Sequence, residues 1–204
     1  MLELPNFSLH DWVATPDRGR KNRPGQADLA ECLIGDPATG RQVGLARERP
    51  GAAAWKFWRA RVTFDVFEAI PDHPLLCSVQ QFRGVRSLVE VHDAEGHLVG
   101  RCGEQRIEDA YGWAWACLER MGKTRRFIDA AGHELAIVTP APSGELLAFQ
   151  PAVGDNPFAR MLLLAAVLAE TWRRPRRRAT EPDGGKFESA FHGWGESSGY
   201  LSPG

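Results

Sequence analysis

One segment near the C-terminus is apolar on every face of a helix, and it constrains the fold more than any other feature. Residues 161–169 read MLLLAAVLA, about two and a half helical turns without a polar position. A bilayer crossing needs roughly 20 apolar residues, whereas Arg160 and Glu170 interrupt this segment on both sides. We therefore expect a helix that is surrounded by the rest of the chain.

The flanking residues indicate where this helix begins and ends. Asn156 can cap a helix N-terminus, and Pro157 fits the first helical turn. Pro175 disfavours continuation because proline lacks a backbone N–H donor. The sequence predicts a helix over about residues 157–174.

Upstream of the helix, short apolar alternations are separated by Gly, Pro and Asp, as is typical of strands and turns. One phrase recurs: an apolar strand end, an Asp, a Gly three or four residues later, then an apolar residue followed by Gly or Ala. The Asp can accept bonds from turn amides, and the Gly can adopt positive φ. The copies cover residues 34–44, 91–100 and 127–136 and predict three hairpins.

The last residue of each copy is small, at Gly44, Gly100 and Ala136. A small strand residue indicates a close approach by another backbone or side chain, as would occur around an internal helix. Since only strands precede the helix, a sheet must curl around it. We expect a mainly β fold, an antiparallel barrel enclosing one hydrophobic C-terminal helix.

Three phrases together carry a family resemblance: VEVHDAEGHLVGRC, RRFIDAAGHELAIV and NPFARMLLLAAVLAETW. Over about residues 31–172 the chain resembles the scramblase-like and LURP-one-related branch of the tubby C-terminal superfamily. The resemblance implies a barrel of about twelve strands around a hydrophobic helix, together with phospholipid association. The cysteine-rich and proline-rich segments of animal scramblases have no counterpart here, so the membrane anchoring of those proteins is not implied.

The expected organisation is one domain with irregular ends, which suits 204 residues. Residues 1–30 form an irregular segment that can pack on the barrel, and residues 31–178 form the barrel with its helix. Residues 179–204, rich in Gly, Ser, Glu and Pro, form a flexible tail. The opening residues lack the pattern of a signal peptide, which favours the cytoplasm, with contact at most to a membrane surface.

Local basic clusters are the candidate ligand-binding residues, because the whole-chain charge of −1 favours neither nucleic acid nor a membrane. A run directly after the helix can bind anionic headgroups or can simply be a solvated helix end. A second group can form an anion pocket, as in phosphoinositide-binding tubby domains. The run is Arg173, Arg174, Arg176, Arg177 and Arg178, and the second group is Arg83, Arg86, Lys123, Arg125 and Arg126.

The sequence offers no recognisable catalytic or metal-binding pattern. The four cysteines form no C-x-x-C pair and are expected to be reduced core residues. His92, His97 and His133 are expected on hairpins rather than around a metal. No serine lies in a G-x-S-x-G context, and no cofactor is implied.

The aromatic residues are expected to fill the core rather than contact a membrane, namely Trp55, Phe57, Trp58, Trp113 and Trp115.

Three functions remain open from the sequence. The first is a non-enzymatic, phospholipid-associated module that binds anionic headgroups. The second is a structural or protein-interaction domain whose aromatic-containing tail, residues 179–204, recruits a protein partner. The third is an enzyme with a site among the loops, which no motif supports.

Overall fold

The computed structural model describes residues 1–15, 29–49, 61–82 and 88–180, with the side chains of 14, 15, 61–63 and 173–180 excepted. The elements in chain order are β1 (Asn6–His10), β2 (Val13–Thr15), β3 (Leu29–Gly35), β4 (Gln42–Glu48), β5 (Arg61–Glu68), β6 (Leu75–Phe82), β7 (Leu88–Asp93), β8 (Leu98–Cys102), β9 (Arg106–Asp109), β10 (Ala114–Met121), β11 (Thr124–Asp129), β12 (Glu134–Ala141), β13 (Gly144–Phe149), a 3-10 turn η1 (Pro151–Val153) and α1 (Pro157–Thr180).

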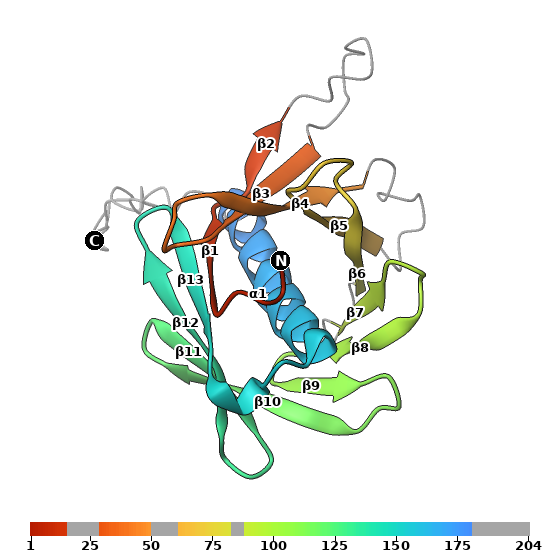
Figure 1. Cartoon of the computed structure of the whole chain (residues 1–204), viewed down its shortest axis with the longest axis vertical. Helices are drawn as coiled ribbons and strands as arrows, with labels where there is room; N and C mark the ends of the chain where they lie inside the picture. The colour runs from red at the N-terminus through yellow and green to blue at the C-terminus, as the bar shows by residue number, and fades with distance from the viewer. Residues whose placement is uncertain (16–28, 50–60, 83–87, 181–204) are drawn as a thin grey trace, which may run out of the picture.

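Twelve antiparallel strands close into a barrel (Figure 1). Strands β3 to β13 each pair with the next along the chain, and β1 lies between β13 and β3. Strand β2 continues alongside β3. The prediction of an antiparallel barrel around a C-terminal helix is confirmed.

The N-terminal segment is part of the barrel wall, so the prediction of an irregular segment over residues 1–30 is wrong for β1 and β2. Phe7 pairs with Leu147, and Leu9 pairs with Ile34 across the closing seam. Phe7 and Leu9 are buried, while the polar residues on either side are only partly so. This alternation is a strand signal, but it contains only two apolar residues and is easily overlooked.

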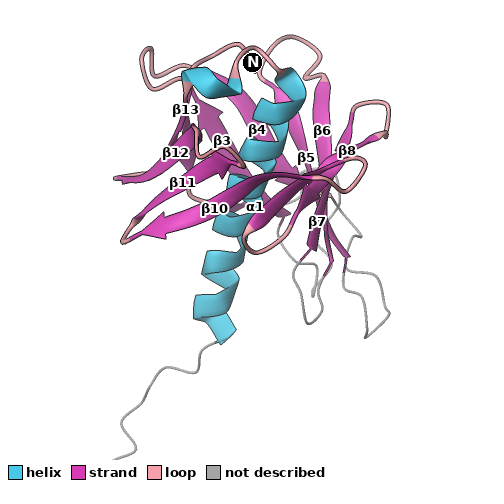
Figure 2. Cartoon of the chain, turned by 90° about the horizontal axis from the view of Figure 1, so that it is seen from below, coloured by secondary structure: helices cyan, strands magenta, loops and turns pink. Residues whose placement is uncertain are grey.

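Helix α1 runs through the middle of the barrel (Figures 1 and 2). Leu163, Leu164 and Leu168 are fully buried, and Ala165 and Val167 are equally inaccessible. The Asn156 side chain accepts bonds from the backbone N–H groups of Phe158 and Ala159, at 3.0 and 3.2 Å. The enclosed helix and its cap therefore match the expectation from sequence.

The helix continues to Thr180, so the predicted end near Arg174 is wrong. Pro175 removes the single hydrogen bond that its N–H would donate to the carbonyl of Thr171. The arginines on both sides of Pro175 are strong helix formers, which favours continuation. Within the described ranges, no helix combines the length and the hydrophobicity that crossing a membrane requires.

Three hairpin turns share one hydrogen-bonded pattern: two of the three predicted copies and one turn that was not predicted. The predicted copy at residues 34–44 differs, because Asp36 accepts from the backbone N–H of Ala38 and from the Thr39 hydroxyl. In the β7–β8 and β11–β12 turns, the aspartates Asp93 and Asp129 accept bonds from the backbone N–H groups of His97 and His133. Residues 109–113, Asp-Ala-Tyr-Gly-Trp, make the same turn between β9 and β10. Their glycine has a φ of 87°, against 88° and 86° in the other two turns.

The exposed histidines and aspartates of these turns pair locally. The His133 ring lies 3.0 Å from the Asp129 carboxylate, and its backbone N–H donates to the same group. The side-chain bond from His133 is the main cause that holds the pKa of Asp129 below its usual value. These residues stabilise turns.

The small residues predicted to allow a close approach do so at two positions. A Cβ on Gly100 would lie 2.3 Å from the Glu108 carbonyl oxygen and 3.0 Å from both terminal carbons of Leu162 on α1. A Cβ on Gly44 would lie 2.5 Å from the Met1 sulfur. Gly100 therefore lets the barrel wall contact the helix.

Replacing Gly100 with valine should lower the free energy of unfolding by about 1–3 kcal/mol, because overpacking displaces α1 or β9. Gly103→Val is the matched control in the turn that follows the same strand, because a Cβ at Gly103 would lie 3.6 Å from its nearest atom, the Arg106 carbonyl oxygen. Urea unfolding should show a clear loss of stability for Gly100→Val and a much smaller one for Gly103→Val. Equal stabilities of the two variants would contradict the close contact.

The cysteines behave as core residues, as predicted. Cys32, Cys77 and Cys102 are buried, Cys117 is partly buried, and all four are free thiols. Burial, followed by the nearby Asp11 carboxylate, raises the pKa of the Cys32 thiol to about 12. A thiol in this environment stays protonated and unreactive.

Candidate ligand-binding site at the helix-exit end

The two ends of the barrel differ in what they expose. The turns that follow β3, β5, β7, β9 and β11 lie at one end, where β13 leads into α1; we call this the helix-start end. The turns that follow β8, β10 and β12 lie at the opposite, helix-exit end, where α1 passes beyond the strands (Figure 2). The candidate site and the arginine run both belong to the helix-exit end.

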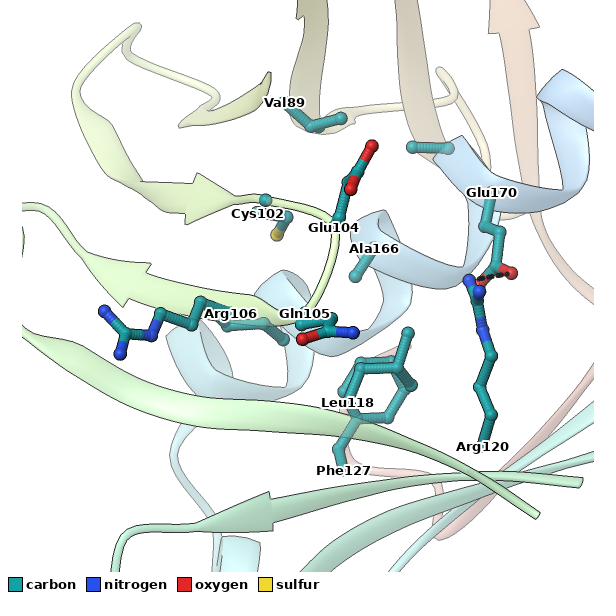
Figure 3. Close-up of a pocket in the computed structure, with 13 residues that line it drawn as sticks. Val89, Cys102, Glu104, Gln105, Arg106, Leu118, Arg120, Phe127, Ala166 and Glu170 are labelled. Atoms are coloured by element: carbon teal, nitrogen blue, oxygen red, sulfur yellow. Dashed lines mark hydrogen bonds and ion pairs between the residues drawn. The ribbon is translucent and has the colours of Figure 1, made fainter. Parts of the chain in front are cut away.

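A pocket of about 380 Å³ lies between α1 and the barrel wall at this end (Figure 3). Its inner surface includes Leu118 of β10, Phe127 of β11 and Ala166 of α1. The hollow exists because α1 presents Ala166 and Ala169 to this part of the wall, and alanine side chains leave the space between helix and strands unfilled.

The outer part of the pocket is charged. Glu104 and Gln105 come from the turn between β8 and β9, while Arg120 and Glu170 come from β10 and α1. Arg120 donates to the Glu170 carboxylate at 3.0 Å, and the Arg120 side chain is still 62% exposed. The pocket therefore combines an apolar interior with a polar rim.

Behind this rim, a buried ionic network connects the wall to the helix. Arg125 of β11 is 3% exposed and donates to both Glu145 of β13 and Glu170 of α1. Glu145 is 6% exposed. Arg120 extends the network to β10, so three strands and the helix are joined by four charged side chains.

Of the predicted basic group, the three members that the structure describes do not converge on one anion pocket. Arg125 and Arg126 are consecutive on β11 and therefore face opposite sides of the wall. Arg125 points inward to its carboxylates, whereas Arg126 pairs with Glu119 and Glu134 at 2.9 and 3.7 Å. Lys123 is exposed in the turn before β11. Arg83 and Arg86 lie outside the described residues.

The predicted arginine run lies on the part of α1 that extends past the barrel (Figure 2). The backbone is helical through Arg173, Arg174, Arg176, Arg177 and Arg178. The side chains of these five residues lie outside the described part of the structure. The sequence places five positive charges within six residues at this point.

The helix-start end carries two exposed aromatic side chains in the β9–β10 turn. Tyr111 is 87% exposed and Trp113 is 75% exposed. The expectation that Trp113 fills the core is therefore wrong, because the turn directs it outward; Trp115 packs against the core. Trp55, Phe57 and Trp58 lie outside the described residues.

Sequence reasoning missed the pocket and the carboxylates around Arg125. Glu145 and Glu170 are separated from Arg125 by 20 and 45 residues, so no local sequence pattern predicts these ion pairs. Across the described residues, no group of three or more His, Cys, Asp or Glu side chains could hold a metal ion.

Protein-family models, curated proteins and solved structures were all compared with this chain, and none of them matches it.

Proposed function

We propose that the protein is a non-enzymatic, cytoplasmic module of the scramblase-like and tubby-like type, which binds anionic phospholipid headgroups at the helix-exit end. One observation carries the proposal: the part of α1 that continues beyond the barrel (Figure 2) contains the run of five arginines that follows the apolar segment. A closed barrel that surrounds a hydrophobic helix supports the proposed relation to that superfamily.

The energetics favour a peripheral contact. A basic residue near an anionic membrane surface gains about 1 kcal/mol, and the gain falls off within a Debye length. Because the whole chain has a net charge of −1, attraction to the membrane must come from the local run. Binding should therefore be strong at low salt and weak at high salt.

Removing part of the run should abolish most of this attraction. The variant R176Q/R177Q/R178Q is expected to bind phosphatidylserine-containing vesicles about 100-fold more weakly than the wild type at low salt, since three charges contribute about 1 kcal/mol each. The matched control R176K/R177K/R178K changes the same three residues but keeps their positive charges. Vesicle co-sedimentation measures both.

The control should bind like the wild type, because lysine and arginine carry the same charge and the attraction to an anionic surface depends on that charge. If both triple variants bind equally, or the wild type does not bind anionic vesicles at low salt, the proposal is wrong.

A second candidate function is a protein-interaction domain without a lipid role, favoured by Tyr111 and Trp113. Aromatic side chains of these types are enriched among the residues that dominate binding energy at interfaces. Of the predicted flexible recruiting tail, residues 179–204, the first two residues belong to α1, so that part of the prediction is wrong, and residues 181–204 lie outside the described residues. The variant Y111E/W113H uses the residues that the β7–β8 turn carries at the equivalent positions, Glu95 and His97. Loss of crosslinked partners in cells, with vesicle binding unchanged, would favour this candidate.

A further inference from the structure

We propose that the pocket beside α1 holds one alkyl chain of an anionic amphiphile, with the anionic group at the rim next to Arg120. The inference rests on the proposed function, because it assigns a lipid-derived ligand to the same end of the barrel. The shared chemistry is an acyl chain that ends in a carboxylate or a phosphate. Its source is either a free fatty acid or one chain of a phospholipid.

The interior of the pocket fits an alkyl chain. Ile107 and Phe127 are each 2% exposed, and Leu118 and Ala166 complete an apolar surface that belongs to both wall and helix. A volume of about 380 Å³ lies in the range of small-molecule sites, roughly 300–1,000 Å³. An alkyl chain that enters the pocket removes its own apolar surface and that of the lining residues from water, which favours binding.

The rim fits an anionic group. Arg120 donates from one guanidinium nitrogen to Glu170, and its side chain remains 62% exposed to solvent. A guanidinium binds carboxylates and phosphates with paired hydrogen bonds. Two carboxylates, Glu104 and Glu170, are among the described residues that line the pocket. Glu170 is paired with Arg120, whereas Glu104 disfavours an anion at the mouth.

The mouth also lies on the side from which α1 leaves the barrel. Glu170 lines the pocket, and the first arginine of the run follows only three residues later. An amphiphile with its chain inside would therefore place its head close to the beginning of the run. The pocket and the run then serve the two parts of one ligand.

Filling the pocket tests the chain-binding step. Ala166→Phe places a ring in the hollow and should weaken laurate binding, measured by isothermal titration calorimetry, at least 10-fold. Ala131→Phe adds the same ring to an exposed turn at the helix-start end and should bind laurate like the wild type. If Ala166→Phe fails to fold, Leu118→Phe narrows the same pocket from the opposite wall.

The charge of the head group is tested separately. Glu104→Gln should strengthen laurate binding about threefold and weaken binding of dodecyltrimethylammonium, which has the opposite charge. Absence of laurate binding by the wild type, equal binding by Ala166→Phe, or a preference for dodecyltrimethylammonium would each overturn the proposal.

Vesicles distinguish this proposal from the proposed function and separate the two sources of the chain. R176Q/R177Q/R178Q should lose vesicle binding but keep laurate binding. Loss of vesicle binding by Ala166→Phe identifies a phospholipid chain as the ligand, and retention identifies a free fatty acid. If wild-type protein binds vesicles but not laurate or lysophosphatidate, the pocket proposal fails while the proposed function stands.

Discussion

Replacing Arg125 with methionine is expected to lower the free energy of unfolding by about 3–5 kcal/mol, because it removes the central cation from a buried ionic network. Arg125 is 3% exposed and donates to Glu145 and Glu170, which belong to β13 and α1. For a chain of this length the melting temperature should fall by roughly 10 °C. Thermal unfolding followed by circular dichroism measures the change.

The neighbouring residue on the same strand provides the control. Arg126→Met removes the same charge from the outer face, where Arg126 is 36% exposed and pairs with Glu119. Ion pairs of this kind contribute about 0–1 kcal/mol. If the two methionine variants are equally stable, Arg125 does not connect the wall to the helix in the way described.

Replacing Leu164 with aspartate should prevent folding or reduce stability by more than about 4 kcal/mol, since a carboxylate without a partner is very costly in an apolar interior. Leu164 of α1 is fully buried, and the barrel wall surrounds this helix (Figure 1). The expected result is loss of the cooperative transition in urea, or a midpoint far below that of the wild type.

Phe158→Asp introduces the same residue into the same helix at a position that is 53% exposed. It lies in the first turn, where a negative charge interacts favourably with the helix dipole. This variant should unfold close to the wild type. Similar losses for both variants would mean that α1 is not enclosed as described.

The parts of the fold that were predictable from sequence are those with local signals. The Asp and Gly of each hairpin act within a few residues of one another, as in Asp129 to His133. The helix carries its own cap and lacks a polar face, which requires an enclosing wall. These local patterns were sufficient for the barrel.

The remaining features depend on contacts between distant segments. The placement of β1 requires Phe7 and Leu9 to find β13 and β3 across the whole chain. The turn between β9 and β10 was missed because Tyr111 and Trp113 look like strand residues of a core, although the same turn geometry exposes them. The position of α1 against β10 and β11 creates the pocket. The spacing of residues along the chain does not predict how the helix is placed against these strands.

The enclosed helix also limits how the protein can act on a membrane. The residues of α1 that could insert into a bilayer are those that form the barrel core, from Met161 to Ala169. Transferring them to lipid would remove the interior of the barrel. A surface contact through the arginine run leaves this core intact.

Hydrogen exchange of residues 161–169, followed by mass spectrometry with and without phosphatidylserine vesicles, tests the enclosed helix most directly. Amides in a core element exchange only through large openings of the structure. The account predicts that α1 is as protected as the barrel strands in both conditions. A helix that left the barrel for the membrane would stay protected by lipid, whereas the emptied barrel would open. Fast exchange of the amides of β7 to β13 upon vesicle binding, while those of α1 stay protected, would therefore contradict an enclosed helix.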